Sequence, residues 1–272
     1  MRQKIQSLAE NLPRYASHVW HKRRYELVFA SMAVVFLGLM YVFVALAGEM
    51  SEGDTQKFDE RILLALRRPD DLHTPIGPAW LKGMMLDITA LGGPICLGIF
   101  SAALIGLLFI EGQRRVAWLA VLAICGGTSL SFALKELFGR ARPTIVPHLR
   151  EVTSTSFPSG HAMSAAIVYL TIGVMLAKAM RGRWAKAYCM FWGATLALLV
   201  GSSRAFLGVH YPSDVVGGWI AGLTWASGCW IVSQFIPTTE LVPEPEQPGA
   251  EKKAQFRSRF AIGMRLPRRP SR

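Results

Sequence analysis

Long stretches without a charged residue constrain this chain more than any other feature. We place six of them, at 27–48, 88–110, 116–134, 160–177, 187–203 and 215–236. Their lengths, roughly 17–25 residues, match the apolar run that a helix needs to cross the hydrocarbon core of a bilayer. The sequence therefore predicts an all-α polytopic membrane protein with six transmembrane helices.

The charged residues indicate how these six spans are oriented. The net charge is +12, and the basic residues lie mainly between and beyond the apolar runs, so no basic domain is left to bind nucleic acid. Six spans put both termini on one side, together with the turns near Arg114 and Lys178, and all four segments are basic. Because cytoplasmic loops are enriched in Lys and Arg, this side is predicted to be cytoplasmic.

We divide the chain into three parts. Residues 1–26 form a basic cytoplasmic N-terminal segment, residues 27–237 form the six-span membrane domain, and residues 238–272 form a basic cytoplasmic tail. The tail is rich in Pro, Glu, Lys and Arg, a composition that cannot bury a hydrophobic core, so we expect it to be disordered.

Three short polar motifs lie between positions 135 and 214, each at the end of a predicted span. The first is Lys135-x6-Arg142-Pro143, after the third span. The planar fork of an arginine matches phosphate oxygens, and a lysine adds a mobile positive charge. Taken alone, these residues are equally well explained as basic side chains that reach the membrane interface at a helix end. We expect Arg140, beside the motif, to lie behind the binding residues or at the surface.

The second motif is Pro158-Ser159-Gly160-His161, at the start of the fourth span. Ser159 is a suitable N-cap, and Gly160 lets the backbone approach a ligand closely. The free N–H groups of a helix N-terminus attract anions, and a histidine on the first turn can give a proton to a leaving oxygen. Taken alone, a capped helix start with an interfacial histidine is the simpler explanation.

The third motif is Ser203-Arg204, followed by His210 and Asp214. In a turn or helix, the four-residue spacing lets Asp214 accept a hydrogen bond from the far nitrogen of His210. Such a bond fixes the tautomer and raises the basicity of the other nitrogen, which can then attack phosphorus. The sequence Pro212-Ser213-Asp214 is also typical of a helix start, so both interpretations can be true of Asp214.

The three motifs carry more weight together than singly, because all fall at span ends on the same predicted face. Basic residues on that face go against the positive-inside rule. Charged residues beside membrane spans are costly and usually functional. We therefore predict a site for an anionic ligand at the periplasmic ends of predicted helices 3 to 6.

The motifs resemble the signature of the type 2 phosphatidic acid phosphatase superfamily, and no signature position differs. That signature reads Lys-x6-Arg-Pro, Pro-Ser-Gly-His and Ser-Arg-x5-His-x3-Asp, and it covers positions 135–214 of this chain. The six-span layout extends the resemblance across 27–237, and the two tails lie outside it. The superfamily also includes bacterial undecaprenyl-diphosphate phosphatases and soluble vanadium haloperoxidases.

The resemblance implies a role for each motif residue. His210 would be the nucleophile that forms a phosphohistidine, oriented by Asp214, and His161 would protonate the leaving group. The phosphoryl oxygens would be held by Lys135, Arg142, Ser159, Gly160 and Arg204. These positive charges would replace a metal in stabilising the transition state, so we expect no cofactor and no metal site.

We therefore expect an integral-membrane hydrolase of a lipid phosphomonoester or diphosphate, in the inner membrane if the source is a bacterium. Undecaprenyl diphosphate is the first candidate substrate; phosphatidylglycerophosphate, phosphatidic acid and lipid A phosphates are alternatives. The motifs do not distinguish this phosphatase from a phosphotransferase that passes the group to a second lipid. A lipid transporter fits less well, because the charges cluster at one face, and a haloperoxidase would be soluble. The expected partners are the bilayer and the lipid phosphate, and the oligomeric state stays open.

Overall fold

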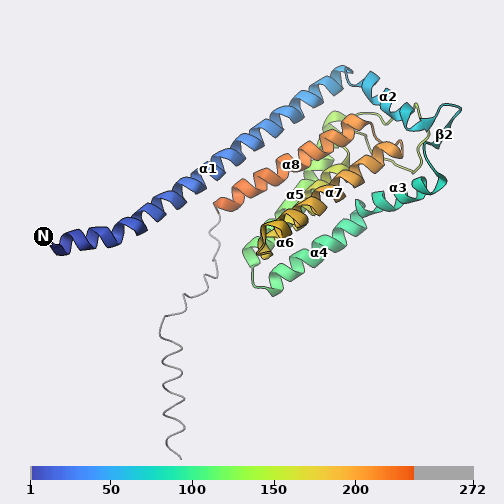
Figure 1. The fold of residues 1–272 in the computed structure, drawn as a ribbon. Coiled ribbons are helices and arrows are strands. Elements are labelled where there is room, and N and C mark those ends of the chain that lie inside the picture. The colour runs from blue at the N-terminus through green and yellow to red at the C-terminus, as the bar shows by residue number, and fades with distance from the viewer. Residues whose placement is uncertain (1, 236–272) are drawn as a thin grey trace, which may run out of the picture. The chain divides into compact units, whose positions relative to one another are not determined.

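The computed structural model describes the backbone of residues 2–235 and the side chains of residues 26–235. The predicted tail at 238–272 lies outside the described residues. Helices and one two-stranded sheet make up the described part of the chain (Figure 1). They are α1 (Arg2–Glu52), α2 (Gln56–Ala65), β1 (Arg67–Arg68), β2 (Asp71–Pro75), α3 (Ala79–Leu91), α4 (Pro94–Ile110), α5 (Arg114–Phe138), α6 (Gly160–Ala179), α7 (Arg183–Phe206) and α8 (Pro212–Gln234).

Five of the described helices are long and apolar enough to cross a membrane, namely α1 from Glu26 onward, α5, α6, α7 and α8. The bent pair of α3 and α4 passes the same test together, which makes six if the pair counts as one span. The prediction of a mainly helical protein with about six apolar spans is therefore confirmed, except for the two short strands. The bounds of α5 to α8 lie within a few residues of the predicted runs.

The second predicted span, at 88–110, is not a single straight helix. Helices α3 and α4 meet at an angle of 45°, with a break at Gly92 and Gly93. Pro94, the first residue of α4, has no N–H and its ring clashes with the carbonyl four residues earlier, so α3 cannot continue through it. Gly92 is needed for close approach to α7, because a Cβ there would lie 2.2 Å from Cγ1 of Val200.

The segment between α2 and α3 contains a hairpin that the sequence did not predict. Strands β1 and β2 pair antiparallel. The side chain of Arg67 is buried, and its guanidinium donates to the carbonyls of Phe206 at 2.9 Å and Pro147 at 3.5 Å. These bonds tie the hairpin to the end of α7 and to the α5–α6 loop, which carries part of the first two motifs.

Helix α6 packs against α5, α7 and α8 (Figure 1). Its contact with α8 depends on small residues: a Cβ on Gly218 would lie 2.6 Å from the carbonyl oxygen of Ser159, and one on Gly222 would lie 2.8 Å from that of Met163. Small residues let membrane helices pack closely, which matters because lipid supplies no hydrophobic drive for association. This contact brings the first turns of α6 and α8 together, and with them the second and third motifs.

We expect Gly222→Ala to destabilise the protein by about 1–3 kcal/mol, the usual cost of overpacking. The new methyl group would press on the backbone of α6, which cannot move aside as a flexible side chain could. Gly98→Ala in α4 is the matched control, because a Cβ there meets nothing within 4 Å and alanine favours a helix. Thermal unfolding in detergent should show a lower melting temperature for G222A alone. Equal melting temperatures would contradict tight packing between α6 and α8.

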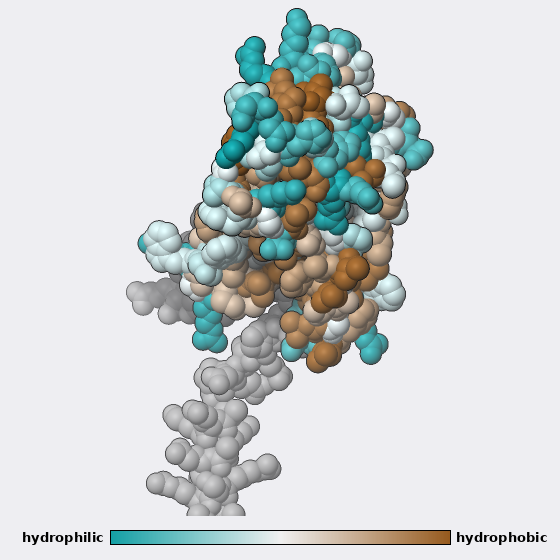
Figure 2. Space-filling view, turned by 90° about the vertical axis from the view of Figure 1, so that its right-hand side faces the viewer, coloured by the Kyte–Doolittle hydropathy of each residue, from teal (hydrophilic) through white to brown (hydrophobic). Residues whose placement is uncertain are grey.

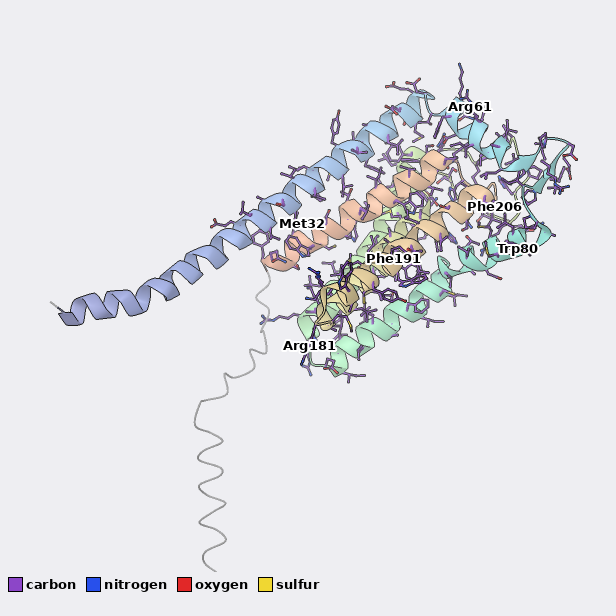
Figure 3. The ribbon with its side chains drawn as sticks, viewed as in Figure 1. Met32, Arg61, Trp80, Arg181, Phe191 and Phe206 are labelled. Carbon is purple, nitrogen blue, oxygen red and sulfur yellow. The ribbon has the colours of Figure 1, made fainter. Side chains whose placement is uncertain are left out.

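The ends of α5 and α7 and the starts of α6 and α8 lie at the same end of the bundle as α2 and the hairpin (Figure 1). The α4–α5 and α6–α7 turns lie at the other end; Figure 3 labels Arg181 there and Arg61 and Phe206 at the first end. Figure 2 views the molecule from the first end, where hydrophilic side chains gather with hydrophobic ones between them. The polar motifs are thus collected at one end of the bundle.

Candidate active site

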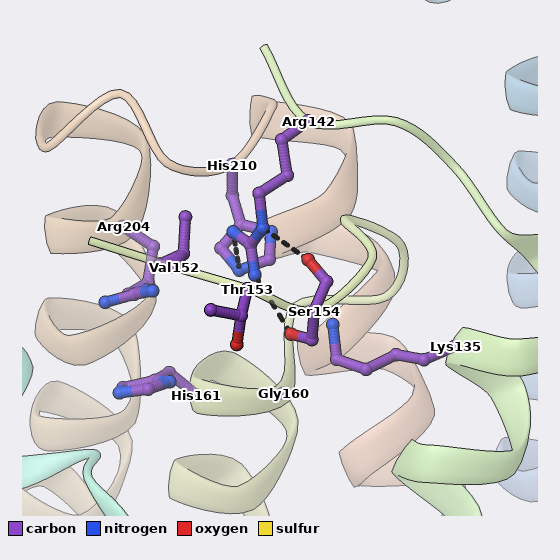
Figure 4. A pocket seen from close by; sticks show the side chains of 9 residues that line it. All are labelled: Lys135, Arg142, Val152, Thr153, Ser154, Gly160, His161, Arg204 and His210. Carbon is purple, nitrogen blue, oxygen red and sulfur yellow. Dashed lines mark hydrogen bonds between the residues drawn. The ribbon is translucent and has the colours of Figure 1, made fainter. Parts of the chain in front are cut away.

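A cavity of about 150 Å³ lies at the end of the bundle where α5 and α7 end and α6 and α8 begin. Figure 4 shows its lining, which comes from five segments: Lys135 of α5, Gly160 and His161 of α6, Arg204 of α7, His210 of the α7–α8 turn, and Arg142, Val152, Thr153 and Ser154 of the α5–α6 loop. The structure therefore brings residues of all three motifs to one cavity.

Three basic side chains line the cavity without a carboxylate to neutralise them. Lys135 donates to the carbonyl of Thr155 at 2.7 Å, and Arg142 donates to that of Ser154 at 2.6 Å. Neither they nor Arg204 make an ion pair with a carboxylate in the described part of the chain. Burial lowers the pKa of Arg142, because a charge away from water is costly. An anion in the cavity would supply the missing negative charge.

Buried polar atoms near the cavity lack hydrogen-bond partners among the described residues. They are Nε2 of His161, Oγ of Ser159 and Nε of Arg204. The guanidinium of Arg204 is otherwise held by Oγ1 of Thr89 at 3.1 Å. Buried polar groups in native proteins nearly always have a partner, and the exceptions call for an explanation. A ligand with several acceptor and donor oxygens would satisfy these atoms.

His210 is buried, and its two ring nitrogens face different surroundings. Nε2 lies 3.2 Å from Nη1 of Arg142, and Nδ1 lies 3.5 Å from Oδ2 of Asp214 and 3.4 Å from Oγ of Ser156. An arginine can only donate, so Nε2 is the unprotonated nitrogen, beside Arg142, and Nδ1 carries the proton. Burial lowers the pKa of His210 to about 3, against the opposing effect of Asp214. The imidazole is therefore uncharged at neutral pH, as a nucleophile must be.

The carboxylate of Asp214 is held on both oxygens. Oδ2 accepts hydrogen bonds from Oγ of Ser156 at 2.5 Å and from the backbone N–H of Tyr211 at 2.8 Å. Oδ1 accepts from Nη1 of Arg140 at 2.6 Å. The bond to Tyr211 makes Asp214 part of the capping box of α8, so it both starts the helix and faces His210.

Several known proteins are similar to this chain in sequence and in fold. Residues 116–237 match the sequence model of the PAP2 superfamily. The chain is 35% identical over 199 residues to phosphatidylglycerophosphatase B of Bacillus subtilis (strain 168), an alignment that covers 69% of this chain and 89% of that protein. This chain belongs to the PAP2 superfamily.

A second sequence relative and a solved structure support the same family. Undecaprenyl-diphosphatase of Sulfolobus acidocaldarius is 33% identical over 47% of this chain and 56% of its own length. The crystal structure of the first transmembrane PAP2 type phosphatidylglycerolphosphate phosphatase from Bacillus subtilis superposes with a TM-score of 0.67 at 30% identity, covering 75% of this chain and 98% of that one. This PAP2 protein is therefore an integral-membrane hydrolase of phosphoric ester or anhydride bonds, in a family of lipid phosphatases.

Six of the eight predicted site residues of this PAP2 protein line the cavity: Lys135, Arg142, Gly160, His161, Arg204 and His210. The other two are buried beside it, Ser159 next to Gly160 and Asp214 behind His210. Their catalytic and binding roles stay predictions.

Several residues of the site were not singled out from the sequence. Val152, Thr153 and Ser154 line the cavity, and Ser156 contacts Asp214. The run of Thr and Ser at 153–156, inside the loop between the first two motifs, was the available signal. Nothing in the sequence pointed to Thr89, which accepts a hydrogen bond from Arg204, because it lies in a predicted span far from the motifs.

Proposed function

We propose that this protein removes a phosphoryl group from a membrane lipid through a phosphohistidine at His210, without a metal. One observation supports this most directly: His210 lines the cavity, its unprotonated Nε2 lies beside Arg142, and the three cations of the lining have no carboxylate partner among the described residues. Preorganised cations stabilise the negative charge that the phosphoryl oxygens carry in the transition state. The cations are Lys135, Arg142 and Arg204.

The reaction has two steps. Nε2 of His210 attacks phosphorus, so that an N–P bond forms while the bond from phosphorus to the leaving oxygen breaks, and His161 gives that oxygen a proton. The Nδ1–H of His210 faces Asp214, which stabilises the imidazolium that forms. A water molecule then attacks the phosphohistidine and gives a proton back to His161, which releases inorganic phosphate and restores both histidines.

The names of the relatives support a lipid substrate and suggest which headgroups to test. A relative aligned over 89% of its length is named phosphatidylglycerophosphatase B, and one aligned over 56% is named undecaprenyl-diphosphatase. We propose phosphatidylglycerophosphate and undecaprenyl diphosphate as the first two substrates to compare. Phosphatidic acid and lipid A phosphates complete the panel.

We further propose that the site faces the periplasm of a bacterial inner membrane. The helix ends and turns opposite to the cavity carry Arg114 and Arg115 at the start of α5, Lys178 at the end of α6, and Arg181 in the turn that follows. Short loops rich in Lys and Arg stay on the cytoplasmic side, so the cavity would lie on the other side. Cysteine labelling of each end in intact cells tests this orientation.

The purified protein in detergent should release inorganic phosphate from at least one lipid of the panel, and EDTA should leave the rate unchanged. We expect this because side-chain cations, and no metal ion, would hold the phosphoryl oxygens. Detergent removes any gradient, so turnover also separates an enzyme from a transporter. A rate that EDTA abolishes and Mg²⁺ restores would contradict metal-independent hydrolysis. Transfer of the group to an added second lipid, with no free phosphate, would identify a phosphotransferase.

A further inference from the structure

Asp59 is a buried carboxylate that lies outside the three motifs and outside the membrane spans. It sits on α2, is 0% exposed, and accepts three hydrogen bonds. These come from the backbone N–H of Ser213 at 2.8 Å, the hydroxyl of Ser213 at 2.5 Å and Nη2 of Arg140 at 2.9 Å. Burying a carboxylate is costly unless it is paired and hydrogen-bonded. The proposed reaction does not use Asp59, so its placement calls for an explanation.

Arg140 connects Asp59 to the residues behind the cavity. Its Nη1 donates to Oδ1 of Asp214 at 2.6 Å and to the hydroxyl of Ser213 at 2.7 Å. Its guanidinium lies 4.3 Å from the centre of the Tyr211 ring. The planar group is thus held on several sides, and a planar fork fixes the direction of the carboxylate that it binds. Asp214 is thereby kept with Oδ2 toward His210.

The charges alternate along this row, from Asp59 to Arg140 to Asp214. Arg140 alone would cancel the charge of Asp214 and weaken its effect on His210. Asp59 offsets Arg140, so the row keeps one negative charge in excess. That charge is needed because His210 becomes an imidazolium in the reaction, while the three cations of the cavity oppose a positive charge on it.

We propose that Asp59 and Arg140 are positioning residues for the catalytic pair. Arg140 orients the carboxylate of Asp214, and Asp59 prevents Arg140 from cancelling its charge. This proposal rests on the phosphohistidine mechanism above and extends it to α2, a helix that carries none of the three motifs. Neither residue lines the cavity, so the effect of each passes through Asp214.

Two single variants, Asp59→Asn and Arg140→Met, test the two roles. D59N leaves Arg140 paired with Asp214 alone, and R140M leaves two buried carboxylates without a cation, so that one of them takes up a proton. Both should lower kcat by about 10- to 100-fold, the size of effect found when residues that orient a metal-bound histidine or carboxylate are changed. KM should stay near the wild-type value, because neither residue reaches the substrate. The substrates are phosphatidylglycerophosphate and undecaprenyl diphosphate in detergent micelles.

The double variant Asp59→Asn with Arg140→Met separates electrostatics from packing. It removes the cation and its counter-charge together, so Asp214 keeps the excess negative charge. Ser156 and the backbone N–H of Tyr211 still bind its Oδ2, so part of its orientation remains without Arg140. Its kcat should therefore exceed that of either single variant, although it has lost more contacts than either. A purely structural role predicts the reverse, with the double variant the worst of the three and kcat following the melting temperature.

His210→Ala runs beside these variants, so that two kinds of failure can be told apart. Wild-type kcat in D59N and R140M, with H210A inactive, would overturn the positioning role and leave the proposed function standing. An active H210A would overturn the proposed function itself. If D59N does not fold, Arg140→Lys against Arg140→Met decides. The lysine keeps the charge balance and should retain more activity than methionine at equal melting temperature; equal or lower activity would overturn the proposal.

Discussion

Replacing His210 with alanine should lower phosphate release by at least about 10⁴-fold, as removal of a nucleophile does in enzymes with a covalent intermediate. His161, the other imidazole that lines the cavity, lies on α6 and is proposed to serve the leaving group, so we do not expect it to replace His210. Phosphate release from lipid micelles measures the loss. Acid-labile but base-stable ³²P on the wild-type protein, absent from H210A, would show the phosphohistidine directly.

The matched control for this variant is His73→Ala. His73 is exposed on β2 and does not line the cavity, so its loss should leave the rate near the wild-type value. Melting temperatures of both variants show whether the fold is kept. Turnover near the wild-type rate in folded H210A would rule out His210 as the nucleophile.

Replacing His161 with alanine should lower the rate by about 10²–10⁴-fold on lipid substrates, the usual contribution of a general acid. The loss should shrink on aryl phosphates, because a phenolate with a low pKa leaves without a proton. We assign the proton donation to His161 because its Nε2 is buried at the cavity and has no partner among the described residues, so it could bond to a leaving oxygen (Figure 4).

The decisive measurement compares H161A with the wild type over a series of leaving groups. A steeper dependence of log rate on leaving-group pKa in the variant would support proton donation. If the loss is the same for every leaving group, His161 is not the acid, and a binding role like the one proposed for Arg204 would replace it.

Much of this fold could be predicted because the apolar runs that indicate membrane spans are continuous in the sequence. A span is encoded in its own apolar residues, so the bounds of α5 to α8 follow closely from the predicted runs. The bend between α3 and α4 was missed, although Gly92, Gly93 and Pro94 were visible. Its geometry depends on the contact of Gly92 with Val200 on α7, and the sequence does not state which helices are neighbours.

Some residues of the site could likewise be predicted from the sequence, and others could not. Lys135, His161 and His210 could be found because each sits in a short motif with a resemblance to a known family. Asp59 could not, since its carboxylate is defined by contacts with Arg140 and Ser213, which are distant in sequence. In the sequence it is one acidic residue in a short amphipathic helix. Of the two positions predicted for Arg140, behind the binding residues or at the surface, the structure has the first, but its partners could not be read from the sequence.

The close contact of α6 with α8 has a consequence for how the enzyme could acquire a new substrate. With Gly218 and Gly222 against the backbone of α6, the two helices are packed closely, and the bundle sets the spacing between His161 and His210. The α5–α6 loop is the adjustable part, because it contributes the cavity residues at 152–154. Diversification should therefore exchange loop sequences while the helices keep one chemistry, and a redesign for a different headgroup should begin with those three positions.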